Sequence, residues 1–127
     1  MNIFLNILVG MGLAASVVTG AAAGTKITFN DGQTVVNVLS GNSVVGQLSD
    51  GTSYCEYHDS NSAVFGRDFE VYAGNWYVSN DYVCYTYPGT GTDCQRARVK
   101  GQRITFKDAN NGQMLAQGTV IQGNVCS

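Results

Sequence analysis

The segment Gly74–Cys94, with the sequence GNWYVSNDYVCYTYPGTGTDC, predicts three consecutive β-strands. Two runs rich in aromatic and β-branched residues lie on either side of an Asn-Asp turn, and a Pro-Gly turn leads into the third strand. A cysteine stands on each side of this second turn. The segment indicates a small exported β-rich domain with a disulfide, and it points to no reaction.

The register of the first hairpin follows from the length of its turn. A two-residue turn at positions 80 and 81 pairs Val78 with Val83, and it pairs Trp76 with Tyr85. Because side chains alternate between the faces of a strand, the core face is expected to carry Trp76, Val78, Val83, Tyr85 and Tyr87. The outer face is expected to carry Tyr77, Tyr82, Cys84 and Thr86.

Four cysteines allow three disulfide connectivities. We expect Cys84 to pair with Cys94 across the hairpin, and Cys55 to pair with Cys126. Loop-entropy arguments give about 3 kcal/mol for the short loop and about 4 kcal/mol for the long one. A metal site and a cofactor are not expected, because no Cys-x-x-Cys pair occurs and His58 is the one histidine of the chain.

Outward from this segment, turn signals recur along the whole chain, which is typical of an all-β sandwich or barrel. Strands are predicted at Ser43–Ser49, Thr52–His58, Ala63–Ala73, Asn75–Ser79, Tyr82–Tyr87, Cys94–Val99, Gln102–Lys107 and Gln113–Ile121. The predicted fold is an antiparallel meander of seven to eight strands, closed as an up-and-down barrel or folded as a curled sandwich.

Two further elements are predicted before the meander. Lys26–Phe29 is a candidate lead-in strand. A short helix is predicted to follow a cap at Asn30-Asp31, with Val35, Val36 and Leu39 as its apolar residues and Gly41 at its left-handed end.

The first 23 residues have the features of a signal peptide. The run from Ile3 to Val18 is mostly apolar, and it leads into Ala21-Ala22-Ala23 before Gly24. The alternative is an uncleaved membrane anchor, which the small residues and Asn6 make a poor membrane span. Residues 24–127 are then one disulfide-stabilised domain, periplasmic or secreted.

The charges of the chain are few and unevenly placed. A formal net charge of −2 argues against a nucleic-acid binder. Five of the cations lie on one predicted hairpin, namely Arg96, Arg98, Lys100, Arg103 and Lys107. With Lys100-Gly101 as its turn, Arg98 would face Arg103. Acidic residues of the preceding strands could neutralise this hairpin, or it could bind a polysaccharide carboxylate or a lipid phosphate.

Seven tyrosines lie between positions 54 and 87. Aromatic side chains suit sheet faces, so structural use is the default interpretation. The alternative is a binding surface, because tyrosine offers a large amphipathic contact. Tyr77 and Tyr82 are predicted to lie near each other on the outer face, and they are the best candidates for binding.

Catalysis finds little support in the sequence. There is no Gly-x-Ser-x-Gly motif, and the nearest approach to an acid–base pair is Glu56 with His58 on one face of a predicted strand. We interpret these two as polar residues on a solvated face, because one pair is not a catalytic constellation. The chain is therefore not expected to be an enzyme.

Several phrases of the chain occur together: Leu39-Ser-Gly-Asn-Ser-Val44, Tyr54-Cys-Glu-Tyr57, Gly74-Asn-Trp76, Cys84-Tyr-Thr-Tyr87 and Cys94. In combination they resemble a group of small exported proteobacterial domains without an established activity. The resemblance implies that Cys84 and Cys94 pair, while Cys55 and Cys126 are additions to the pattern. The Gly-x-Trp phrase is also similar to one in lipocalins and avidins, although in lipocalins it lies near the start of the barrel.

The predicted function is non-catalytic binding in the cell envelope, of either a small amphipathic ligand or an envelope protein. The alternative is an inhibitor of a secreted hydrolase, a lysozyme or a protease, acting through the loop Pro88–Asp93. A cavity of several hundred Å³ lined by Trp76, Tyr85 and Phe106 would favour a ligand. A filled interior with an exposed tyrosine patch would favour a protein partner.

Overall fold

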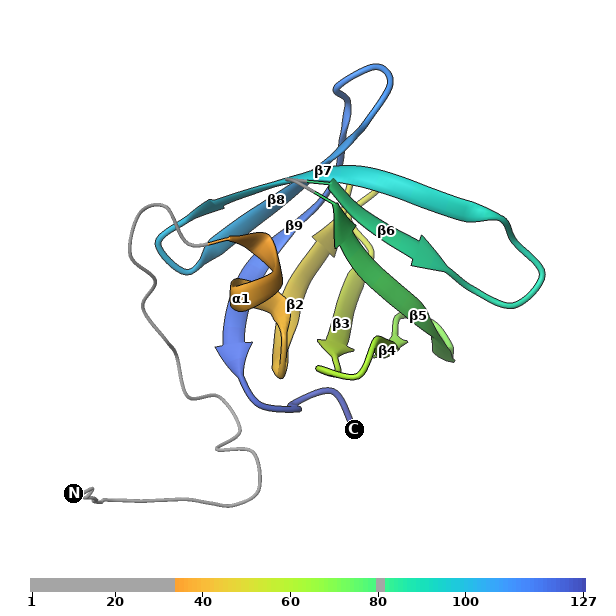
Figure 1. Cartoon of the computed structure of the whole chain (residues 1–127), viewed down its shortest axis with the longest axis vertical. Helices are drawn as coiled ribbons and strands as arrows, with labels where there is room; N and C mark the ends of the chain where they lie inside the picture. Colours follow the sequence, from red (N-terminus) through yellow and green to blue (C-terminus); the bar gives the residue numbers. More distant parts are fainter. Residues whose placement is uncertain (1–33, 80–81) are drawn as a thin grey trace.

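The computed structural model describes residues 34–79 and 82–127. These residues form one short helix and eight antiparallel strands that close into a barrel in sequence order (Figure 1). The elements are α1 (Val35–Leu39), β2 (Asn42–Leu48), β3 (Ser53–His58), β4 (Ala63–Arg67), β5 (Val71–Ser79), β6 (Tyr82–Thr86), β7 (Thr92–Lys100), β8 (Arg103–Asp108) and β9 (Met114–Gln122). The predicted all-β meander is thus confirmed, as an up-and-down barrel.

Three predictions concern residues outside the described ranges. They are the signal peptide over residues 1–23, the lead-in strand Lys26–Phe29 and the turn at positions 80 and 81. The registers on either side of that turn are nevertheless described. Val78 pairs with Val83, Trp76 with Tyr85 and Cys84 with Cys94, which confirms the predicted register.

The helix α1 covers one end of the barrel. Its buried residues Val35, Val38 and Leu39 pack into the core cluster, and the helix contacts β2, β5 and β7 from different parts of the barrel wall. Packing of this apolar stripe outweighs the β preference of the valines. Its N-cap is Thr34 rather than the predicted Asn30-Asp31, and Gly41 has the expected positive φ of 78°.

Two disulfides are present, and they are the two predicted pairs. Cys84–Cys94 joins β6 to β7, and Cys55–Cys126 ties the segment after β9 to β3. Both bridges join side chains on the outer face of the wall, which leaves the interior to other residues. Two disulfides indicate an oxidising, non-cytoplasmic environment.

The predicted strand Ala63–Ala73 is wrong. The chain turns at Asp68-Phe69-Glu70, because the Asp68 carboxylate accepts a hydrogen bond from the Glu70 N–H at 3.0 Å. The Asp68 N–H donates to the Glu70 carbonyl at 3.1 Å. The predicted break at Gly74 does not occur, since Gly74 lies within β5.

The register of the basic hairpin also differs from the prediction. Its turn residues are Gly101 and Gln102, so Lys100 pairs with Arg103 and Arg98 pairs with Thr105. A positive φ of 61° at Gly101, the first turn position, fits a type II′ turn, in which glycine is preferred there. Like charges still face each other, but they are Lys100 and Arg103.

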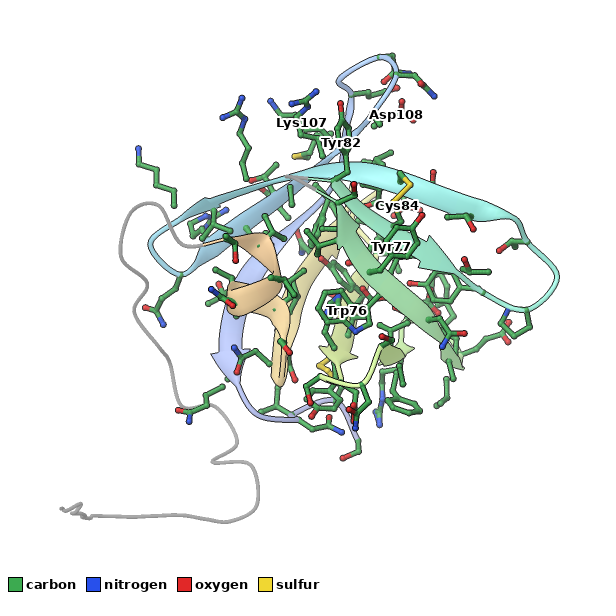
Figure 2. All side chains as sticks on the ribbon, in the orientation of Figure 1. Trp76, Tyr77, Tyr82, Cys84, Lys107 and Asp108 are labelled. Atoms are coloured by element: carbon green, nitrogen blue, oxygen red, sulfur yellow. A yellow bond between two sulfur atoms is a disulfide. The ribbon has the colours of Figure 1, made fainter. Side chains whose placement is uncertain are left out.

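The half of the interior nearest α1 is filled by apolar side chains. We call it the closed half and define it by Val44, Val64, Trp76, Val83, Ile104 and Val120, together with Val38 and Leu39 of α1. All of these side chains are buried, and Trp76 lies within the barrel (Figure 2). The closed half is the hydrophobic core that holds the barrel together.

Candidate functional site

The other half of the interior contains a cavity of about 350 Å³. Its lining includes Leu48 at the end of β2 and Leu115 near the start of β9, so it lies at the barrel end opposite α1. Apart from Ala116, the remaining wall is formed by aromatic and polar side chains, namely Tyr54, Glu56, Asp68, Tyr72, Tyr85, Tyr87, Gln95 and Phe106. We call this region the open half.

Glu56 of β3 is the polar centre of the open half. Its side chain points into the barrel, and the residue is only 7% exposed. The hydroxyls of Tyr72 and Tyr87 both donate to Glu56 Oε2, at 2.8 Å and 2.7 Å. Two phenols, one on β5 and one directly after β6, therefore hold one carboxyl group in place.

Two glycines make room for these phenol rings. A Cβ at Gly66, which pairs with Tyr72, would lie 2.5 Å from the Tyr72 ring. A Cβ at Gly74 would lie 2.7 Å from the Tyr87 ring and would also meet the Thr86 carbonyl oxygen. Each ring thus packs directly against a glycine of the barrel wall. Because the glycine has no side chain, the hydroxyl of the ring can reach Glu56.

His58 lies at the border between the two halves. It is fully buried, and its Nε2 is 2.8 Å from the Tyr85 hydroxyl and 3.5 Å from Glu56 Oε1. The edge of its ring contacts Trp76 at a centroid distance of 5.0 Å. Burial lowers the pKa of His58 to about 3, so the imidazole is neutral at pH 7.

Burial raises the pKa of the Glu56 carboxyl, while hydrogen bonds from Tyr87, Tyr72 and Tyr85 act in the opposite direction. Burial also raises the pKa of each of these phenols, and the nearby Glu56 charge adds to the effect. The phenols consequently keep their protons at neutral pH and act as donors to Glu56.

Tyr54 is the one phenol of the open half whose hydroxyl has no hydrogen-bond partner among the described residues. The residue is 7% exposed and lines the cavity. A buried polar group without a partner carries a desolvation penalty of about 1–3 kcal/mol. This hydroxyl is therefore available to a bound molecule.

The structure corrects the interpretation of Glu56 and His58 as residues of a solvated face. Both side chains point into the barrel, because β3 alternates inward Tyr54, Glu56 and His58 with outward residues. One feature of the sequence could have predicted this inward orientation. If Cys55 forms a disulfide on the outer face, period-two alternation directs its neighbour Glu56 inward.

The predicted tyrosine pair lies on the outer face. Tyr77 is 54% exposed, and Tyr82 is half-buried at a diagonal position on the next strand. The Arg96 guanidinium lies 4.9 Å from the centre of the Tyr82 ring, and Arg96 Nη2 donates to the Tyr82 hydroxyl at 2.8 Å. Tyr82 thus packs with Arg96, and the two predicted tyrosines do not form a cluster by themselves.

The predicted basic residues gather on the outside of the β7–β8 hairpin. Arg98, Lys100, Arg103 and Lys107 line a shallow hollow there with Thr105. Lys107 and Tyr82 project on the same side of the barrel, beyond the β7 ribbon (Figure 2). None of these four cations forms an ion pair with a carboxylate of the described residues, so direct neutralisation by the acidic strands is not seen there.

Within residues 34–79 and 82–127, no helix is long and apolar enough to cross a membrane. Comparisons of the chain with protein-family models, with curated proteins and with solved structures find no match.

Proposed function

We propose that this chain is an exported, non-catalytic binding protein of the periplasm or the extracellular space, and that it holds a small amphipathic ligand in its open half. The observation that carries the proposal is the cavity of about 350 Å³ with its buried polar centre. Ligand sites of proteins are commonly clefts of about 300–1,000 Å³, mostly apolar, with a few polar groups that fix orientation.

The lining of the cavity supports a ligand with one polar end. Phe106, Leu48 and Leu115 offer apolar contacts, while Glu56 and the Tyr54 hydroxyl offer polar ones. Tyr85 and Phe106 line the cavity as the ligand hypothesis requires, whereas Trp76 belongs to the closed half. An amphipathic molecule would match this lining, with its apolar part on the leucines and Phe106 and its polar end at Glu56 and the Tyr54 hydroxyl.

The geometry supports binding better than catalysis. His58 is separated from the cavity by Tyr85, and it is not among the lining residues. A histidine whose pKa lies at about 3 is a weak base at neutral pH. Glu56 has its Oε2 occupied by two phenol donors, which suits a positioning group.

The proposal can be tested with the neutral fluorescent probe N-phenyl-1-naphthylamine. We expect saturable fluorescence enhancement with the wild-type protein. Ala116→Leu, which places a larger side chain in the cavity, should abolish the enhancement. Ala73→Leu makes the same change at an exposed position of β5, and it should bind the probe like the wild type. Equal binding by both variants would refute the proposed site.

A second candidate function is favoured by the cations on the β7–β8 face, four of which form no ion pair with a carboxylate of the described residues. The hollow lined by Arg98, Lys100, Arg103 and Lys107 could bind anionic oxygens of a polysaccharide or a lipid. The test is binding to polygalacturonate and to phosphatidylglycerol vesicles at several salt concentrations. Arg98→Glu should weaken binding, while Arg67→Glu on β4 should not. Unchanged binding in Arg98→Glu would exclude this function.

The predicted alternative, inhibition of a secreted hydrolase through Pro88–Asp93, has weaker support. Thr92 and Asp93 belong to β7, so the free loop is shorter than expected. Assays with a lysozyme and with trypsin, using the wild type and a variant with residues 88–91 replaced by Asn-Gly, would test it directly. Inhibition lost only in the loop variant would favour this alternative over the ligand proposal.

A further inference from the structure

We propose that the ligand of the open half is an organic ammonium ion, a small molecule with one protonated amine and an apolar body. This inference rests on the proposed function, since it specifies the chemistry of the ligand in that same cavity.

The charges around the cavity favour a cation. Two carboxyl groups belong to its described lining, Glu56 at the wall and Asp68 at the β4–β5 turn. No lysine or arginine is among these lining residues. The cations of β7 and β8 are directed to the outer face of the same sheet, as the hollow lined by Arg98 and Lys107 shows. The wall thus separates the acidic groups that line the cavity and its rim from the basic outer face, and an anionic ligand would meet repulsion in the cavity.

Aromatic rings surround the carboxyl group. Tyr72 and Tyr87 meet edge to face at a centroid distance of 5.3 Å, and Tyr85 stacks parallel to Tyr87 at 6.0 Å. All three rings line the cavity. Aromatic faces attract cations through the ring quadrupole, and they do so more strongly where water is excluded. Rings grouped around a carboxyl group are the arrangement that recognises substituted ammonium ions.

The polar atoms of the cavity that remain available to a ligand are mainly acceptors, which favours a ligand that donates hydrogen bonds. Tyr72 and Tyr87 give their protons to Glu56 Oε2, so what each phenol oxygen can still offer a ligand is a lone pair. The carboxyl group of Glu56 lines the cavity, and a carboxylate accepts more than one hydrogen bond at each oxygen, so it can accept a further one from a ligand. The Tyr54 oxygen, buried and without a partner, can accept as well. The site therefore has more acceptors than donors, and an ammonium group supplies donors together with positive charge.

The Tyr54 hydroxyl, which has no hydrogen-bond partner among the described residues, is evidence for a ligand that does not depend on Glu56 and Asp68. An acidic cavity alone could be a solvated cleft, but a nine-tenths buried hydroxyl that lines the same space lacks the partner that buried groups normally have. A neutral apolar ligand would leave this hydroxyl without a partner, whereas an amine can donate to its oxygen.

Three probes of similar size separate the ligand classes: 2-phenylethylamine, 2-phenylethanol and 3-phenylpropanoate. Each is titrated into the full protein at pH 7.5, with N-phenyl-1-naphthylamine displacement and calorimetry as readouts. We expect the amine to bind about tenfold more tightly than the alcohol, which corresponds to one charge-assisted hydrogen bond, and the carboxylate to bind weakest.

Glu56→Gln is the decisive variant, because the amide keeps the size of the side chain and can still accept from a phenol. Its amine affinity should fall about tenfold, to the level of the alcohol, while its alcohol affinity stays within about threefold of wild type. Glu70→Gln makes the same change at an exposed position of the β4–β5 turn, and it should keep the preference for the amine.

Tyr54→Phe and Asp68→Asn provide an independent route should Glu56→Gln fail to fold. Each should lower the amine-to-alcohol affinity ratio by about threefold. Equal binding of amine and alcohol by the wild type would overturn the inference but leave the ligand cavity standing. A preference for the amine that survives all three substitutions would overturn it as well. If no probe binds, including N-phenyl-1-naphthylamine, the proposed function itself fails.

Discussion

In the closed half of the barrel, valine, isoleucine and tryptophan side chains fill the interior beneath α1, whereas in the open half four tyrosines and a glutamate surround a cavity. The same strands build both halves. On β3, Tyr54 and Glu56 belong to the open half, and His58, two residues further on, lies at the border with the closed half. The difference shows how a small barrel can divide its interior, with one half filled by apolar packing and the other left open around a polar centre.

The largest expected effect is a loss of stability in the closed half. Ile104 is fully buried, so Ile104→Ala should lower the free energy of unfolding by about 3 kcal/mol. Leu115 is half-buried in the cavity wall. Leu115→Ala should lower the free energy of unfolding by less than about 1.5 kcal/mol, because this side chain borders a cavity rather than closely packed neighbours. Urea unfolding measures both. Equal losses would mean that the two halves contribute alike to stability.

The pH dependence of stability probes the border between the halves. The unfolded chain takes up a proton at His58 below about pH 6.5, whereas the folded chain does so only near pH 3. The unfolded state therefore binds more protons in this window, and folding stability falls as the pH decreases, by about 1.4 kcal/mol per pH unit from this residue. Glu56 has the opposite effect on folding stability above its unfolded pKa. Its folded pKa is raised, so there the folded state binds more protons and its contribution to stability falls as the pH rises.

The His58 contribution is measured between pH 4.5 and pH 3.5, because the opposing contribution of Glu56 arises mainly above the ordinary pKa of that carboxyl. Urea unfolding of wild type and His58→Gln at these two pH values gives the difference. The variant should be less stable at neutral pH, but its loss over this interval should be smaller by about 1 kcal/mol. Parallel curves for the two proteins would mean that His58 is protonated in the folded state.

A comparable effect is expected from Gly66, the glycine that the Tyr72 ring packs against. Gly66→Ala would place a methyl group 2.5 Å from the Tyr72 ring, which must move and weaken its hydrogen bond to Glu56. We expect a loss of about 1–2 kcal/mol and weaker probe binding. Gly91→Ala, where an added Cβ meets nothing within 4 Å, should leave both stability and binding nearly unchanged. Thermal unfolding and probe titration of the two variants make this comparison.

The smallest effect concerns a single hydroxyl. Tyr87→Phe removes one donor to Glu56 and should lower stability by about 1 kcal/mol. The pKa of Glu56 should rise further, because a hydrogen bond that favours the charged form is lost. Carbon-13 NMR of the glutamate carboxyl measures this shift. A lower pKa in the variant would contradict the described hydrogen bonding.

The hairpin at Trp76 and Tyr85 could be predicted because turn length and alternation agree on one register. The basic hairpin could not, since a turn at Lys100-Gly101 and one at Gly101-Gln102 shift the pairing by two residues and keep every side chain on the same face. Hydrophobic alternation does not distinguish these registers. Only the backbone preference of Gly101 does so.

The candidate site could be predicted less well than the fold. A glutamate on a strand is usually solvated, and the phenols that stabilise Glu56 come from β5 and from the residue after β6, distant in sequence. The roles of Gly66 and Gly74 also depend on rings contributed by other strands or later residues. Such contacts exist only after the barrel closes, so the local pattern around Glu56 cannot reveal them.

The helix over the closed half has a kinetic consequence. Since α1 covers one end of the barrel, a ligand of the proposed site would enter at the opposite end, where the β4–β5 turn carries Asp68 and the 88% exposed Phe69. A substitution at Phe69 that obstructs this passage should slow association and dissociation by the same factor. Residence time could thus change at this turn while the equilibrium constant stays fixed.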